Sequence, residues 1–239
     1  MTILAAELCG GDAARARPAA AVVELVHAAS LILDDLPAMD DAPLRRGRPA
    51  NHCEFGEAIA ILAAFGLLNT AYGTLAGAYE PPLAATLTTL LSEAIGINGL
   101  IGGQAVDLLA AEREIDFAML ERIHRGKTGA LFSASATAGA LTAQADRESI
   151  AALSAFAKNL GLAFQIVDDL LDVEGDPAET GKAVRADAKK TTFVSFSGPA
   201  GARQVARELC QTADLALARF GKRADRLREL SAFVAARHL

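Results

Sequence analysis

Two acidic clusters in this chain could bind a metal ion. The first occupies residues 34–41 (DDLPAMDD) and the second residues 168–172 (DDLLD), and each ends an otherwise apolar helical run. Carboxylates gathered at the ends of apolar helices are costly unless a positive group lies between them, because each desolvated charge needs a partner. Magnesium prefers hard oxygen ligands and keeps several waters, so it is the natural candidate.

The spacing of these acids is compatible with convergence on one point. Pro37 ends the helix that carries the first two acids, which places them at its C-terminal end and Asp40 on the turn that follows. Asp168 and Asp172 are four residues apart and share one helical face. Either cluster alone could be a solvated helix end with capping acids. Together they favour a metal site, because acids at a helix C-terminus work against the helix dipole.

Basic residues follow both clusters, and a third basic segment lies between them. They are Arg45, Arg46 and Arg48 after the first cluster, Lys182, Arg185, Lys189 and Lys190 after the second, and Arg125 and Lys127 in the segment HRGKTG at residues 124–129. No Walker loop precedes Lys127-Thr128-Gly129, so taken singly this segment is more typical of a surface turn. A polyphosphate is bound by a metal ion, which the two acidic clusters can hold, and by several cations that neutralise its remaining charge. The sequence therefore predicts a protein that handles diphosphates.

The elements that position these residues are predicted to be helices. The chain has 239 residues, 52% of them apolar, with no Trp and only 2 Tyr. Strands are enriched in aromatic and β-branched residues, whereas Ala and Leu favour helices. Apolar residues recur with the helical period in residues 2–9, 18–36, 55–78, 82–110, 116–142, 147–173 and 200–236. No strand-like alternation, repeat or linker stands out, so we expect an all-α fold and a single domain over residues 1–239.

Composition also excludes several classes of protein. The net charge of −6 argues against nucleic-acid binding, which requires a basic face. Cys9, Cys53 and Cys210 are too widely spaced for a disulfide framework or a zinc site, and they suit a reducing cytoplasm. The longest unbroken apolar run, residues 58–68, is shorter than the roughly 18 residues of a membrane span, and the N-terminus is a poor signal peptide. We therefore expect a soluble cytoplasmic protein.

With these motifs in place, the sequence resembles the trans-isoprenyl diphosphate synthases, or polyprenyl synthetases, and most closely the bacterial geranylgeranyl diphosphate synthases. The matching segments are residues 27–49 (HAASLILDDLPAMDDAPLRRGRP), 55–64 (FGEAIAILAA), 102–108 (GGQAVDL), 127–129 (KTG) and 164–172 (FQIVDDLLD), followed by GK at 181–182 and DAKKTT at 187–192. Two aspartate-rich motifs in this order, each followed by basic residues, are highly specific.

The resemblance implies an all-helical bundle around a deep central cavity, normally a homodimer, with the two aspartate-rich motifs facing each other across the cavity mouth. It implies magnesium binding by Asp34, Asp40 and Asp168, and a catalytic set of these three with Asp35, Asp169, Asp172 and Lys127. It further implies that Arg45, Lys127, Thr128, Gln165, Lys182 and Lys190 hold an allylic diphosphate, and that His27 and Arg46 contact isopentenyl diphosphate.

The implied reaction is ionisation of the allylic substrate, attack of the isopentenyl double bond on the carbocation, and loss of a proton. No side-chain nucleophile is required, because magnesium and the cations stabilise the departing diphosphate. Gln104 and Asp107 are expected either near the cavity or on a polar face satisfied by neighbours.

Two small residues, Ala29 and Ser30, lie five and four positions before Asp34. Farnesyl-producing bacterial relatives typically carry an aromatic residue at the position of Ala29. Its absence here favours geranylgeranyl diphosphate as the product. The alternative is that small residues simply allow close helix packing.

One departure from the family pattern concerns the N-terminus. The Gly-Lys-x-x-Arg-Pro segment that binds isopentenyl diphosphate in the family is absent, and the first helix of the fold is expected to be absent with it. Three hypotheses therefore remain: an active prenyltransferase, a catalytically weak or regulatory subunit, and a class I terpene cyclase. The cyclase is the least favoured, because FQIVDDLLD with downstream lysines is typical of chain elongation.

Overall fold

The computed structural model describes residues 1–110, 113–174 and 191–237, and it is almost entirely helical. The α-helices are α1 (Thr2–Leu8), α2 (Ala13–Asp34), α3 (Asn51–Phe55), α4 (Glu57–Ala78), α5 (Pro81–Ile95), α6 (Leu100–Ala110), α7 (Phe117–His124), α8 (Ala130–Thr142), α9 (Arg147–Glu174), α11 (Phe193–Ala216) and α12 (Asp225–Ala236). A π-helical turn, η1 (Arg125–Gly129), joins α7 to α8, and a 3₁₀ segment, η2 (Ala218–Ala224), joins α11 to α12. The predicted all-α class is confirmed, while the single-domain organisation stays a prediction.

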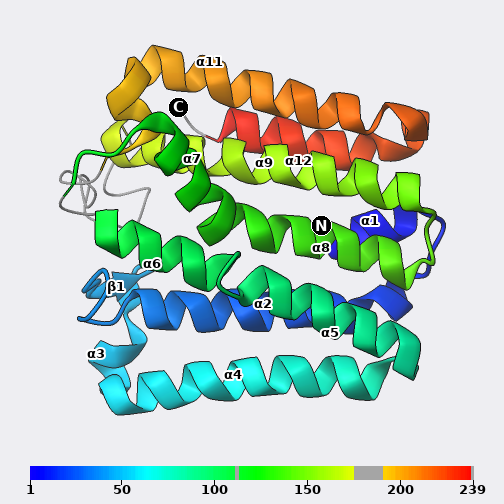
Figure 1. Ribbon diagram of the computed structural model, residues 1–239, viewed down its shortest axis with the longest axis horizontal. Coiled ribbons are helices and arrows are strands. Elements are labelled where there is room, and N and C mark those ends of the chain that lie inside the picture. The colour runs from blue at the N-terminus through cyan, green and yellow to red at the C-terminus, as the bar shows by residue number, and fades with distance from the viewer. Residues whose placement is uncertain (111–112, 175–190, 238–239) are drawn as a thin grey trace.

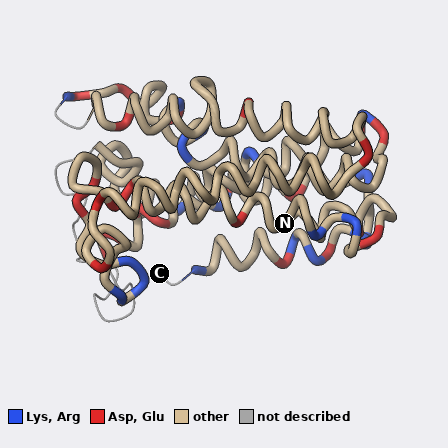
Figure 2. The backbone as a smooth tube through the Cα atoms, turned by 90° about the horizontal axis from the view of Figure 1, so that it is seen from below, with Lys and Arg blue, Asp and Glu red and all other residues tan. Residues whose placement is uncertain are grey.

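The long helices lie side by side, with α4 along one edge of the bundle and α11 along the opposite edge (Figure 1). Charged residues gather mostly toward the helix ends, and the helix shafts carry few of them (Figure 2). This distribution follows from burial, because a charge in the middle of a packed shaft would lose its hydration without gaining a partner. The acidic motifs at the ends of α2 and α9 obey the same rule.

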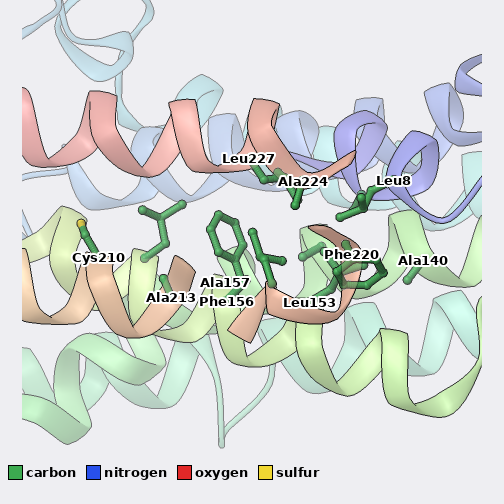
Figure 3. Packing of buried hydrophobic residues seen from close by; sticks show 14 of the residues in the cluster. Leu8, Ala140, Leu153, Phe156, Ala157, Cys210, Ala213, Phe220, Ala224 and Leu227 are labelled. Carbon is green, nitrogen blue, oxygen red and sulfur yellow. The ribbon is translucent and has the colours of Figure 1, made fainter. Parts of the chain in front are cut away.

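Three apolar clusters hold the bundle together, and α9 contributes to two of them. One joins α9 to α1, α8, α11, η2 and α12, and another joins it to α7 and α11. Leu153 and Phe156 lie on one face of α9 (Figure 3), and neither they nor Leu160, one turn further along, have any exposed surface. Burying each such side chain contributes about 1.5–3 kcal/mol. The third cluster joins α2 to α4, α5 and α8. The helices that carry the two acidic motifs are therefore both anchored in the core.

Helix α2 contains Pro18, and a tyrosine from α4's C-terminal end supports the helix there. Tyr79 Oη donates a hydrogen bond to the carbonyl oxygen of Arg15 at 2.8 Å and accepts one from the backbone N–H of Ala19 at 3.0 Å. These are the two groups that an unbroken helix would join directly. The tyrosine thus bridges a gap in the backbone ladder and fixes α2 against α4.

Four helical segments are long and apolar enough to cross a membrane by length and composition alone: Ala13–Asp34, Glu57–Ala78, Pro81–Ala110 and Arg147–Glu174. These segments are candidates only, and the expectation that the chain has no membrane span stays a prediction. Each segment contains isolated polar residues that interrupt its apolar run, and a hydropathy averaged over 18 residues tolerates them. In the structure these helices pack against one another around the apolar clusters.

Candidate active site

The first acidic motif leaves the end of α2 and is fastened by a β-hairpin. Strands β1 (Leu44–Arg45) and β2 (Arg48–Pro49) pair antiparallel, with Arg45 opposite Arg48. The intervening Arg46 and Gly47 both have positive φ, 53° and 74°, as in the type I′ turn that matches the twist of two short strands. The sequence showed no alternation that predicts these strands, because each has only two residues. The hairpin turns three arginines back toward α2.

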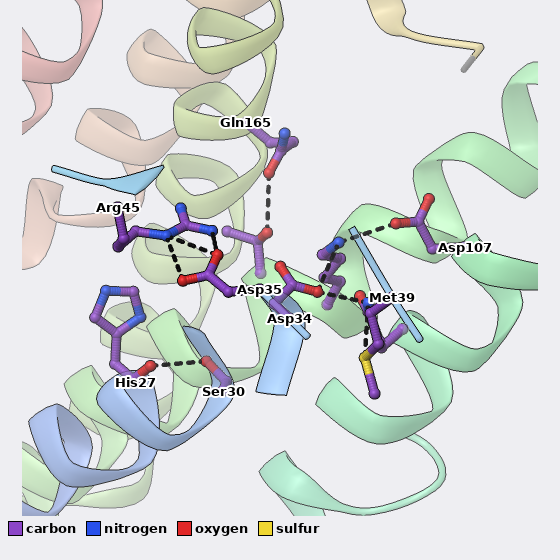
Figure 4. A network of polar contacts seen from close by, with 11 residues as sticks. His27, Ser30, Asp34, Asp35, Met39, Arg45, Asp107 and Gln165 are labelled. Carbon is purple, nitrogen blue, oxygen red and sulfur yellow. Dashed lines mark hydrogen bonds and ion pairs between the residues drawn. The ribbon is translucent and has the colours of Figure 1, made fainter. Parts of the chain in front are cut away.

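Asp35 is the buried acid of the first motif, with 2% of its surface exposed. Arg45 Nε donates to both of its carboxylate oxygens, at 3.0 and 3.2 Å, and Arg45 Nη2 forms an ion pair with Oδ1 (Figure 4). The hydrogen bond to Asp35 raises the pKa of Arg45 despite burial, with further support from Asp34 and Asp40. Arg45 therefore neutralises Asp35 as a permanent cation. Its predicted contact with an allylic diphosphate stays a prediction.

Asp34, the preceding acid, faces a lysine and an amide instead. Lys127 Nζ lies 2.9 Å from Asp107 Oδ2 and 3.6 Å from Asp34 Oδ1. Gln104 Nε2 donates to Asp34 Oδ1 at 2.5 Å. Burial by itself lowers the pKa of Lys127, but the attraction of Asp34 and Asp107 outweighs it and the pKa is raised. Lys127 is thus a charged side chain held between two carboxylates.

The second acidic motif has its own buried acid, Asp169, with 5% of its surface exposed. It accepts hydrogen bonds from Gln165 Nε2 at 3.0 Å and from the backbone N–H of Phe193 at 3.1 Å. That N–H belongs to the first residue of α11, where no carbonyl of the same helix is available to accept it. Thr128 Oγ1 donates to Gln165 Oε1 at 3.0 Å. The second motif is therefore linked through Gln165 to the π-helical turn η1.

The turn η1 connects the two motifs, since its Lys127 contacts the first motif and its Thr128 contacts the second through Gln165. Single π-helical turns occur frequently at functional sites. Taken singly, the sequence Lys127-Thr128-Gly129 is typical of a surface turn. The structure places both side chains, half-buried, at the predicted site.

An open cleft of about 560 Å³ lies beside the first motif, between α2, the hairpin and α3. It is lined by Ala28, Leu31, Ile32, Asp35, Arg45, Arg46, Arg48, Pro49, Asn51, Glu54 and Phe55. Burial lowers the pKa of nearby His27; Glu24 opposes this shift, and Arg46 and Arg45 add to it. His27 is therefore a neutral imidazole at pH 7, next to an arginine-rich cleft.

The remaining predicted residues have mixed outcomes. Ala29 is fully buried, and Ser30 Oγ donates to the carbonyl oxygen of His27 at 2.9 Å; neither residue lines the cleft described above. Lys182 and Lys190 lie outside the described residues. Asp40 is exposed, and Asp168 and Asp172 are half-buried near the C-terminal end of α9. Their predicted roles stay predictions.

A magnesium ion suits the donors at this site, although the carboxylates are not gathered into a cage. Within residues 1–110, 113–174 and 191–237, no group of three or more His, Cys, Asp or Glu is arranged to hold a metal ion. Carboxylates repel one another, and in this structure Lys127 lies beside Asp34. Magnesium is commonly bound by one or two carboxylates together with substrate phosphates. Asp34 and Asp168, both incompletely buried hard oxygen donors, fit that mode of binding.

Gln104 and Asp107 contact the site, a role that the sequence had left open. Gln104 meets Asp34, and Asp107 meets Lys127. Their spacing in the sequence indicates that they act together, because residues three apart on a helix share one face. Sequence reasoning could not decide which neighbour that face would meet.

Comparisons with known proteins agree with this arrangement. The family model described as "Polyprenyl synthetase" matches residues 1–210. The chain belongs to the polyprenyl synthetase family. It is 42% identical to geranylgeranyl pyrophosphate synthase 11, chloroplastic, of Arabidopsis thaliana, over 100% of this chain and 70% of that protein. It is 46% identical to farnesyl diphosphate synthase of Escherichia coli, over 81% of this chain and 67% of that protein.

Solved structures of polyprenyl synthetases share the fold. Geranylgeranyl pyrophosphate synthetase of Pyrococcus horikoshii matches with a TM-score of 0.90 and 30% identity, over 99% of this chain and 84% of that chain. A geranyltransferase of Helicobacter pylori, solved in complex with magnesium and isoprenyl diphosphate, matches with a TM-score of 0.81 and 32% identity, over 94% and 72%. The resemblance inferred from the aspartate-rich motifs is thereby confirmed.

Proposed function

We propose that this polyprenyl synthetase is a magnesium-dependent prenyltransferase that condenses isopentenyl diphosphate with an allylic diphosphate. The observation that carries the proposal is the meeting of both acidic motifs at one basic turn. Lys127 lies 3.6 Å from Asp34, and Thr128 reaches Asp169 through Gln165. Acids and a cation at this spacing suit a magnesium diphosphate, whose metal the acids bind and whose phosphate oxygens the cation neutralises.

In this mechanism the side chains bind, orient and shield the substrates. Asp34, Asp40 and Asp168 would hold magnesium, which supplies charge neutralisation of the leaving diphosphate. Lys127 and Thr128 would donate to the allylic diphosphate from η1, where helix packing already fixes the backbone. The charge that develops on the departing diphosphate is thus met by donors that need little reorganisation.

Isopentenyl diphosphate is assigned to the cleft beside the hairpin. Arg46 and Arg48 line it and are both exposed, so they can meet an anion without breaking a buried ion pair. His27, neutral because burial lowers its pKa, would contribute a hydrogen bond rather than a charge. Leu31 and Ile32 of α2 form an apolar wall of the same cleft, which suits a hydrocarbon tail.

The product is proposed to be geranylgeranyl diphosphate, made from farnesyl diphosphate. Ala29 carries only a methyl group, one turn and a half before Asp34 on α2. A methyl group leaves space for a longer prenyl chain than an aromatic ring would. Because Ala29 has no exposed surface, a ring at this position would fill whatever space the neighbouring helices leave.

A homodimer is part of the proposal, and the outward face of α4 supports it. No charged residue occurs between positions 58 and 79. Leu62 and Phe65 are each 65% exposed, and a Cβ added at Gly66, Gly73 or Gly77 would meet nothing within 4 Å. An exposed apolar face of this kind typically marks a protein interface. The variant Leu62→Glu is expected to shift the protein from dimer to monomer in light scattering after size exclusion, whereas Glu93→Gln on α5 should not.

The decisive experiment is a product assay. The protein is incubated with farnesyl diphosphate, isopentenyl diphosphate and magnesium, and any prenyl product is identified by chromatography and mass spectrometry. Formation of geranylgeranyl diphosphate, lost on addition of a chelator, is the expected outcome. Absence of elongation with diphosphate binding preserved would instead favour a catalytically weak or regulatory subunit.

A further inference from the structure

Helix α6 presents two polar side chains to the site, and both make close contacts there. Gln104 and Asp107 lie on one face of the helix, three residues apart. Gly103 allows α6 to approach η1 closely, because a Cβ at this position would fall 2.2 Å from the backbone nitrogen of Lys127. The contact between α6 and η1 therefore depends on a position where no side chain fits. This contact places Gln104 and Asp107 next to Lys127.

Gln104 is held in a single orientation by its neighbour. It is 9% exposed, and its Nε2 donates to Asp34 Oδ1 at 2.5 Å. A carboxylate accepts hydrogen bonds and does not donate them, so the nitrogen of the amide must face Asp34. The other amide atom, Oε1, is enclosed by protein and has no hydrogen-bond partner among the described residues. Such an atom costs about 1–3 kcal/mol and calls for an explanation.

Asp107 gives Lys127 a second partner besides Asp34. Lys127 Nζ is 0.7 Å closer to Asp107 Oδ2, at 2.9 Å, than to Asp34 Oδ1, at 3.6 Å. All three side chains are between 18% and 24% exposed, so their attraction is only partly screened by solvent. An ammonium group and a divalent cation repel each other at the same carboxylate. Lys127 can move away from Asp34 when another cation binds there, because its closer ion pair with Asp107 remains.

We propose that Gln104 and Asp107 are positioning residues of the magnesium diphosphate site, an inference that rests on the proposed function. Asp107 anchors Lys127 and so leaves Asp34 available to the divalent ion. Gln104 orients Asp34 through Nε2 and offers Oε1 as an acceptor to the hydrated magnesium diphosphate. The unsatisfied amide oxygen is a cost in the ligand-free protein that is recovered on binding.

The test measures binding of magnesium pyrophosphate by titration calorimetry, without turnover. Asp107→Asn keeps the shape of the side chain and removes its charge, so Lys127 should compete for Asp34. Loss of a supporting partner of this kind typically weakens metal binding about 10- to 100-fold. Glu93→Gln removes one exposed acid from α5 and should bind as the wild type does. Asp107→Glu should recover part of the affinity. Unchanged affinity in Asp107→Asn would overturn its role.

Gln104→Met provides a second test that does not depend on Asp107→Asn folding. It removes the donor to Asp34 and also the unsatisfied acceptor, so the change in thermal midpoint should be small, because the two effects oppose each other. Its affinity for magnesium pyrophosphate should nevertheless fall about 10-fold. Gln211→Met, at an exposed position of α11, is the matched control. A residue that only supports the fold would give a lower midpoint with normal affinity, and that result would refute the proposal for Gln104.

The wild-type protein separates this inference from the proposed function. If it binds magnesium pyrophosphate and both α6 variants bind equally well, only the role of α6 is wrong. If the wild type does not bind magnesium pyrophosphate, the proposed function fails and the inference fails with it.

Discussion

The two acidic motifs begin with the same dipeptide, yet the structure stabilises them differently. In each pair the second acid is buried: Asp35 is 2% exposed and Asp169 is 5% exposed. Asp35 is neutralised by the full positive charge of Arg45. Asp169 accepts hydrogen bonds from two uncharged groups of the described part of the chain, the amide of Gln165 and the backbone N–H of Phe193. Among the described residues, the buried acid of the first motif therefore meets an arginine, and the buried acid of the second accepts hydrogen bonds from uncharged groups.

This difference shows how one dipeptide serves two purposes. Consecutive residues of a helix point about 100° apart, so when one acid turns inward the other does not. Asp34 and Asp168 remain incompletely buried. Asp35 and Asp169 fasten the hairpin and the start of α11, respectively. The first acid of each pair is therefore suited to a ligand, and the second to structure.

The largest expected effect follows from removing the first acid of either motif. Asp34→Ala and Asp168→Ala should each lower magnesium-dependent turnover by at least about 100- to 1,000-fold, because each removes charge stabilisation at the leaving group. Folding should change little, since the loss also relieves repulsion among like charges. Steady-state kinetics and circular dichroism measure the two effects. Global unfolding of either variant would contradict the assignment.

Removing the second acid should instead affect stability, and unequally. Asp35→Asn removes the counter-charge in contact with Arg45; because Arg45 is partly exposed, we expect a loss of about 2–3 kcal/mol rather than the larger value for a fully buried pair. Asp169→Asn can retain one acceptor for the N–H of Phe193 and should cost about 1 kcal/mol. Urea denaturation gives both free energies of unfolding. Equal losses would mean that the ion pair and the hydrogen bonds are equivalent supports.

The positions five residues before each motif offer a matched pair. Ala29 and Ala163 are both fully buried. Ala29→Phe should shorten the product, because the ring would occupy space below the first motif. Ala163→Phe should cost about 1–3 kcal/mol by overpacking the core, and it controls for that effect. Mass spectrometry of the product measures the chain length, and an unchanged chain length in Ala29→Phe would refute the proposal that Ala29 leaves space for the longer product.

The smallest expected effect concerns pH. Seven residues before Asp34 the chain has His27, whereas seven before Asp168 it has Gly161, which allows α9 to approach Phe132 and Gly129. Burial lowers the folded-state pKa of His27, with Glu24 opposing and Arg46 and Arg45 assisting. The unfolded chain therefore binds a proton more readily, so this contribution to stability is present above pH about 6.5 and is lost as pH falls below that value. His27→Gln should show a shallower drop in thermal midpoint between pH 7.5 and 5.5. An identical drop would exclude His27 as its source.

Helix boundaries show where sequence reasoning reached its limit. The predicted run 82–110 is interrupted after Ile95, where the backbone leaves α5 before α6 begins. The predicted run 116–142 contains η1, where Gly126 and Gly103 let two backbones approach. Apolar periodicity continues through both interruptions, so it does not reveal them. The second interruption lies where η1 packs against α6, an element distant from it along the chain.

The sequence by itself determined the all-helical class, the place of both acidic motifs at helix ends, and membership of the polyprenyl synthetase family. These features depend on residues close together in the chain, through periodicity, proline and spacing. Only the tertiary structure decided that Lys127 would lie between Asp34 and Asp107, and which acid of each pair would be buried. Those outcomes depend on how helices distant in sequence pack. The packing is set by the fit of whole surfaces, which local sequence patterns do not encode.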